Sequence, residues 1–121
     1  MAWGSKTAAT QLTGIGTTEQ FFNQTPTLNP GETAHVEVDF NPPASPTSNL
    51  QVSVYGTLDA SSENWDDTPL MQFTIANSPD PNKLSFLVSG VYKFRVGVIR
   101  SGGSNTDLVA DMAYRLDGVS L

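Results

Sequence analysis

Six stretches of this chain alternate apolar and polar residues with a period of two, and this alternation limits the fold more than any other feature. In residues 34–40, for example, the apolar positions are separated by His35, Glu37 and Asp39. Such alternation is typical of a β-strand with one buried face and one exposed face. The remaining stretches are residues 50–58, 71–75, 84–88, 92–98 and 112–116, and two shorter candidates lie at residues 11–12 and 20–22.

The pattern predicts an all-β protein, because no long window shows the 3.6-residue period of an amphipathic helix. Closely spaced strands without helices between them indicate an antiparallel sandwich or barrel. We therefore expect a single antiparallel β-sandwich, jelly-roll-like, with about eight strands.

The length of 121 residues is that of one domain. Residues 20–121 hold all six long alternating stretches and are expected to form the β-sandwich domain. Residues 1–19 are rich in Thr, Gly, Ala and Gln and have a weaker pattern. We expect them to be an N-terminal arm that orders on a partner, or an edge strand.

Two breaks between the stretches have the chemistry of defined turns. Asn29-Pro30-Gly31-Glu32 fits a type II turn, in which Pro sets φ at the second position and Gly accepts a positive φ at the third. Ser89-Gly90 is a candidate two-residue hairpin turn between the strands on either side of it.

The composition excludes several classes of function. The chain has no cysteine, so disulfides, thiolate zinc sites and cysteine nucleophiles are impossible. Six basic residues against twelve acidic ones give a net charge of −6, which disfavours nucleic acid as a partner. No apolar run approaches the roughly 20 residues of a membrane helix, so no membrane partner is expected.

The sequence gives little support to an enzyme. The one histidine, His35, lies on the polar face of its expected strand, with Glu37 two residues on as a group that could orient it. Nucleophilic catalysis needs a serine, threonine or cysteine held beside such a base, and no G-x-S-x-G motif is present. We therefore interpret His35 as an exposed strand residue and expect no catalytic residue and no cofactor.

The densest acidic patch is formed by Asp59, Glu63, Asp66 and Asp67. Carboxylates at this spacing could bind calcium or act as the acid and base of a glycosidase. The patch lacks the glycine and the ligand spacing of a calcium loop. We interpret it as a solvated loop or a partner contact, without a metal.

Two tryptophans are candidates for contact with a partner. Trp65 lies within the acidic patch, and we rank three roles for it: a cap on the core, an anchor in a protein interface, and a platform for a sugar ring. Trp3 lies in a polar segment, which suggests that it docks onto the body of the domain or onto a neighbour.

The basic residues Lys93 and Arg95 share one face of an expected strand, because they are two residues apart. We expect them to pair with Glu37, with Asp39 or with the acidic surface of a partner. The candidate partner-contact residues are therefore Trp3, Trp65, Asp66, Asp67, Lys93 and Arg95.

The chain resembles the small capsid decoration (cement, or accessory head) proteins of tailed bacteriophages in the style and order of its segments. The resemblance is carried by MAWGSKT, NPGETAHVEVDF, VSVYGTLDASSENWDDTPLMQFTI, VSGVYKFRVGVIRSGG and MAYRLDGVSL. It implies a jelly roll or a related β-sandwich without catalytic activity.

The resemblance also implies a location and partners. Such a protein is a virion component on the exterior of an HK97-type capsid, where it binds the major capsid protein and copies of itself as a homodimer or homotrimer. The alternative is a carbohydrate-binding or receptor-facing module associated with the phage tail, using Trp65, Tyr55 and the acidic patch.

Overall fold

A computed structural model gives the fold of the chain and describes residues 4–41, 49–59, 64–75, 82–100 and 109–118. These residues form eight strands and contain no helix, which confirms the predicted all-β class. The same part of the chain accordingly holds no helix with the length and hydropathy to cross a membrane. The strands are β1 (Thr10–Thr13), β2 (Gln20–Phe21), β3 (Thr33–Asn41), β4 (Leu50–Thr57), β5 (Met71–Ile75), β6 (Asn82–Val88), β7 (Lys93–Arg100) and β8 (Val109–Asp117).

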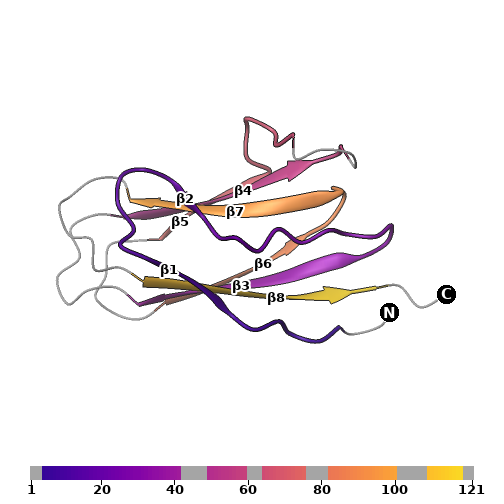
Figure 1. Cartoon of the computed structure of the whole chain (residues 1–121), viewed down its shortest axis with the longest axis horizontal. Coiled ribbons are helices and arrows are strands. Elements are labelled where there is room, and N and C mark those ends of the chain that lie inside the picture. Colours follow the sequence, from indigo (N-terminus) through magenta and orange to yellow (C-terminus); the bar gives the residue numbers. More distant parts are fainter. Residues whose placement is uncertain (1–3, 42–48, 60–63, 76–81, 101–108, 119–121) are drawn as a thin grey trace.

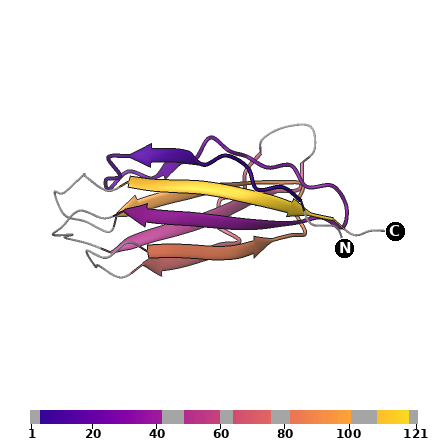
Figure 2. The same cartoon turned by 90° about the horizontal axis from the view of Figure 1, so that it is seen from below.

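The strands form two four-stranded sheets that pack face to face (Figure 1). The first sheet has the order β1-β8-β3-β6, which is visible in Figure 2, and the second has the order β2-β7-β4-β5. All pairs are antiparallel. Apart from β4 and β5, consecutive strands belong to opposite sheets. This arrangement of eight strands is a jelly roll, as expected from the spacing of the alternating stretches.

The core lies between the sheets and is built from the apolar positions of the alternating stretches. In β3 and β7 every core-facing side chain is almost completely buried, including Val36, Phe94 and Val96 at 0% exposure. Ile15 and Phe22, which precede and follow β2, are also buried in this core. The intervening polar residues therefore lie on the outer faces of the sandwich.

The turn before β3 has the predicted geometry. Gly31 has a φ of 85°, and the Glu32 amide donates a hydrogen bond to the Asn29 carbonyl at 3.0 Å. The Glu32 carboxylate in turn accepts a hydrogen bond from the Asn29 amide at 2.6 Å. A positive φ at the third position is the signature of a type II turn, for which glycine has no steric penalty.

The expected hairpin at Ser89-Gly90 is wrong. Gly90 does turn the chain with a φ of 78°, but β6 belongs to the first sheet and β7 to the second. The connection therefore crosses between the sheets, where the Tyr92 amide bonds to the Thr57 carbonyl of β4 at 2.9 Å. Turn residues fix a local change of direction, whereas the partner of each strand is set by long-range packing.

The N-terminal residues lie along β8. In β1, Thr10–Thr13 pair with β8 and form an edge of the first sheet. Before β1, the Thr7 amide donates to the Tyr114 carbonyl at 2.9 Å, and the Gly4 amide donates to the Asp117 carboxylate at 2.9 Å. Both ends of the described chain, at residues 4 and 118, therefore lie together at one end of the sandwich.

Candidate functional site

The outer face of the second sheet carries a cluster of aromatic and charged side chains. Tyr55 of β4 and Arg95 of β7 are partners in the strand register, and both occupy outward positions because their neighbours along each strand face the core. Phe21 of β2 is paired with Gly97 on the other side of β7. The register thus brings three strands together at this point of the face.

Because Gly97 has no side chain, the side chains of Glu19 and Phe21 can pack directly over this position of β7. A Cβ atom at this position would be 2.8 Å from Glu19 Oε2 and 2.9 Å from Phe21 Cε1. Carbon atoms do not approach other heavy atoms this closely without displacement. The absence of a side chain at Gly97 therefore sets how tightly Glu19 and Phe21 pack.

Arg95 lies at the centre of the cluster. Its guanidinium carbon is 3.8 Å from the centroid of the Phe21 ring, 5.1 Å from that of Trp65 and 5.8 Å from that of Tyr55. All three distances are within the range of a cation–π contact. Phe21 and Tyr55 also meet edge to face, with centroids 5.8 Å apart. We call Glu19, Phe21, Tyr55, Trp65 and Arg95 the Arg95 cluster.

Trp65 reaches the cluster from the connection between β4 and β5. Residues 64–70 rise above β4 on the side away from the first sheet (Figure 1). The Asp66 amide donates a hydrogen bond to the Gly56 carbonyl of β4 at 3.0 Å, which attaches this segment to the sheet. Trp65 is half-buried here and does not belong to the core, so its first-ranked role as a core cap is wrong.

Some polar groups of the cluster have hydrogen-bond partners and others do not. The Tyr55 hydroxyl lies 3.1 and 3.2 Å from the two Glu19 carboxylate oxygens and donates to them. Burial and this hydrogen bond raise the pKa of Tyr55, and the nearby Arg95 charge opposes the rise. By contrast, Arg95 Nε is buried without a hydrogen-bond partner, and the guanidinium forms no ion pair within the described part of the chain.

The other predicted contact residues lie around this cluster, with one exception. Asp66 and Asp67 follow Trp65 and are exposed, and Lys93 is half-buried on the same face of β7 as Arg95. Trp3 lies outside the described residues. The structure thus brings Trp65 and Arg95 into contact, and the two aspartates are the residues that follow Trp65 in the chain.

The expected pairing of Arg95 with Glu37 or Asp39 is wrong. Both acidic residues lie on β3 of the first sheet, whereas Arg95 lies on β7 of the second. Glu37 Oε2 is instead 2.9 Å from Lys6 Nζ, and Asp39 Oδ1 is 3.9 Å from Lys83 Nζ. Arg95 and its expected partners therefore lie on opposite outer faces.

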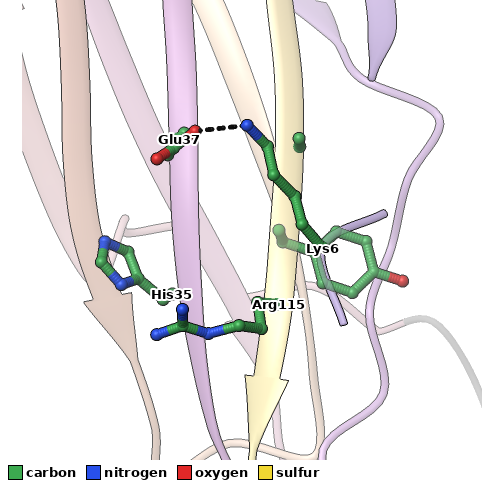
Figure 3. A pocket seen from close by; sticks show the side chains of 6 residues that line it. Lys6, His35, Glu37 and Arg115 are labelled. Carbon is green, nitrogen blue, oxygen red and sulfur yellow. Dashed lines mark ion pairs between the residues drawn. The ribbon is translucent and has the colours of Figure 1, made fainter. Parts of the chain in front are cut away.

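His35 lines a pocket on the first sheet together with Lys6, Glu37 and Arg115 (Figure 3). Lys6 reaches across β8 to Glu37, and this contact lowers the pKa of Glu37 and raises that of Lys6. Glu37 thus pairs with an ammonium group and is not held as an orienting partner of His35. Arg115 in turn donates to Asp117, with Nε 2.9 Å from Oδ1.

The acidic patch is only partly within the described residues. The Asp59 amide donates a hydrogen bond to Thr57 Oγ1 at 3.0 Å. Glu63 lies outside the described residues. Among the residues that the structure describes, no group of three or more His, Asp or Glu side chains is placed to hold a metal ion.

The sequence interpretation missed the contributions of Glu19 and Phe21 to the cluster. Both belong to a region with only a short alternating pattern, so nothing local assigned them to one face. Gly97 was the available signal, because it replaces a side chain at an outward position of an otherwise regular strand. A glycine in a strand interior often marks a close approach by another group.

Comparison with known proteins supplies a fold neighbour but no family. No family model and no curated protein matches the chain. Among solved structures, the chain is similar to a protein of Bacillus endospore appendages, described as a novel family of disulfide-linked pili, with 11% identity and a TM-score of 0.54. The match covers 96% of this chain and 87% of the other. At this identity the similarity concerns the fold alone.

Proposed function

We propose that this chain is a bacteriophage virion structural protein, a decoration protein that binds the outside of an HK97-type capsid. The observation that carries the proposal is the jelly-roll strand order, which is the fold that the resemblance to decoration proteins implies. The protein acts by attachment and has no catalytic role. Its partners are the major capsid protein and other copies of itself, as a homodimer or homotrimer.

The architecture supports a role in which binding is spread over a surface. The sandwich presents two broad outer faces, one bearing the Arg95 cluster and the other bearing the Lys6–Glu37 pair. A subunit that bridges neighbouring capsid subunits and its own symmetry mates gains avidity from several modest contacts. Such a subunit stabilises the shell against expansion or loss of capsomers.

The spore-appendage neighbour has a related fold in a different kind of assembly. Its description refers to disulfide-linked pili, and this chain has no cysteine, so such links are impossible here. The similarity to this pilus protein concerns the fold, and the proposal does not rest on it.

The direct test is mass spectrometry of purified virions of the phage that encodes the chain. A decoration protein is expected at hundreds of copies per particle, and a reconstruction of the particle is expected to show contacts with the capsid exterior and between symmetry mates. Absence of the chain from particles would refute the proposal. Isolated single copies without mutual contact would refute the homo-oligomer.

A second candidate function is a carbohydrate-binding or receptor-facing module of the phage tail. The observation that favours it is the grouping of Trp65 and Tyr55 around Arg95, since aromatic rings can stack on sugars. This candidate predicts a handful of copies per virion and a glycan-array signal that is lost in Trp65→Ala.

A further inference from the structure

Arg95 is a positive charge that the described fold surrounds with aromatic rings and does not neutralise. Its guanidinium lies over Phe21 and near Trp65 and Tyr55, while Nε is buried without a hydrogen-bond partner. A buried donor without an acceptor is costly, and most such donors in folded proteins are paired. The described fold therefore supplies no acceptor to the guanidinium, and its terminal N–H groups are the part that an outside acceptor can reach.

We infer that the Arg95 cluster is the docking point for a carboxylate side chain, Asp or Glu, of a partner protein. The inference rests on the proposed function in taking that partner to be the capsid subunit. Guanidinium groups bind carboxylates through paired, charge-assisted hydrogen bonds that a point charge cannot reproduce. A carboxylate would supply acceptors for the terminal N–H groups of Arg95, which, unlike Nε, are not among the buried atoms without a partner.

Part of the loss of side-chain entropy and hydration that this contact requires has already occurred in the free chain. The three rings restrict the arginine side chain, and Nε is already removed from water. Binding therefore loses less side-chain entropy and less hydration than it would at an extended surface arginine. A rigid arginine within a group of aromatic rings is also the composition of interface hot spots, which are enriched in Trp, Tyr and Arg.

Glu19, the acid within the Arg95 cluster, is held by Tyr55. Glu19 accepts the Tyr55 hydroxyl through both carboxylate oxygens, at 3.1 and 3.2 Å. That contact holds the Glu19 carboxylate against Tyr55 and above Gly97. Glu19 forms no ion pair with Arg95 in the described part of the chain, so the guanidinium remains open to an acid of a partner.

The charges around the Arg95 cluster indicate which kind of partner surface can bind there. Asp66 and Asp67 are exposed directly beyond Trp65, and the whole chain carries a net charge of −6. These charges repel polyanions such as nucleic acid. They favour a partner surface on which one carboxylate is accompanied by Lys or Arg residues that can face Asp66 and Asp67.

The first experiment adds purified chain to particles that lack it and measures occupancy. We expect Arg95→Lys, which keeps the charge and removes the fork of donors, to bind about ten- to a hundredfold more weakly. Lys83→Gln is the matched control, because it removes one positive charge from the first sheet and should bind like wild type. Unchanged melting of each variant would show that the fold is intact.

The second experiment needs no particles and observes the Arg95 Nε–H group directly by NMR. Acetate, the simplest carboxylate, should shift this resonance in the free chain, whereas sodium chloride at equal ionic strength should not. In Phe21→Leu, which loses the ring beneath the guanidinium, the acetate response should weaken.

The outcomes separate the inference from the proposed function. If wild type does not bind particles but acetate shifts Arg95, the proposed function fails and the carboxylate site stands. If wild type and Arg95→Lys bind particles equally, the inference fails and the function stands. Absence of an acetate response would also overturn the inference, as would a glycan-array signal that depends on Arg95.

Discussion

Gly97 of β7 faces Phe21 of β2 so closely that a methyl group at Gly97 would lie 2.9 Å from Phe21 Cε1. The same methyl group would lie 2.8 Å from Glu19 Oε2. The position of the ring under Arg95 and the position of the acid that binds Tyr55 therefore both depend on one missing side chain. A glycine within a regular strand is thus a specific requirement of the outer face.

The first prediction is that Gly97→Ala destabilises the chain by about 1–3 kcal/mol, the usual cost of overpacking. Alanine would otherwise gain roughly 0.5–1 kcal/mol over glycine in a strand, so a net loss reports the displacement of Phe21 and Glu19. Denaturant unfolding measures the change. The control is Gly16→Ala, where no atom lies within 4 Å of the added Cβ. Equal stability of the two variants would contradict the prediction.

The second prediction concerns the core between the sheets. Phe94 is 0% exposed on β7, whereas Leu87 is 60% exposed on β6. Phe94→Ala should lower the free energy of unfolding by about 3–5 kcal/mol, because it leaves a cavity between the sheets. Leu87→Ala should change it by no more than about 0.5 kcal/mol. Comparable losses of stability in both variants would contradict the assignment of Phe94 to the core and of Leu87 to the outer face of the first sheet.

The third prediction is a dependence of stability on pH through Asp117. The hydrogen bond from the Gly4 amide, helped by Arg115, lowers the pKa of Asp117 below its ordinary value of 3.8. A lowered pKa means that the folded state favours the ionised form, so this contribution is present above about pH 4 and is lost as the pH falls through the folded pKa. Asp117→Asn should therefore be less stable than wild type at neutral pH, and the gap should close in acid.

Thermal unfolding of wild type and Asp117→Asn across this pH range measures the gap. Asp67→Asn serves as the control, because it removes the same charge from an exposed position. A gap for Asp117→Asn that does not change between neutral and acidic pH would show that the carboxylate charge is not what Gly4 and Arg115 stabilise.

Most of the strands could be predicted because their signal is local. Successive side chains of a strand point to opposite faces, so a strand with one buried face has apolar residues at every second position of the sequence. All six long alternating stretches and both short candidates correspond to strands of the structure. The turn at Gly31 was predictable for the same reason, since its requirement is the φ of a single residue.

The arrangement of the strands and of the Arg95 cluster depends on contacts that no local pattern encodes. A Ser-Gly turn is compatible both with a hairpin and with a connection that crosses to the other sheet, so Ser89-Gly90 could not show that β6 and β7 belong to different sheets. The alternation placed Arg95 on an outer face but could not state which sheet it belonged to, and so suggested Glu37 as its partner. Trp65 reaches Arg95 only because the β4–β5 connection rises on the outer side of the second sheet.

The last prediction concerns Gln24, which joins the N-terminal residues to the chain that follows β2. Its Nε2 donates to the Ala8 carbonyl at 3.1 Å, and its Oε1 accepts from Thr10 Oγ1 at 3.1 Å. These bonds hold residues 7–10 beside β8, where the Thr7 amide reaches the Tyr114 carbonyl. Gln24→Ala should therefore accelerate hydrogen exchange at the Thr7 amide and through β1, with a loss of global stability of no more than about 1 kcal/mol.

Hydrogen exchange followed by NMR measures this local opening residue by residue. The matched control is Gln72→Ala, which removes the hydrogen bond from Gln72 Nε2 to Ser53 Oγ at 3.1 Å on the second sheet. That variant should leave exchange at the Thr7 amide unchanged, because its bond lies on the opposite outer face. Faster exchange at Thr7 in both variants, or in neither, would show that Gln24 does not hold the N-terminal residues against β8.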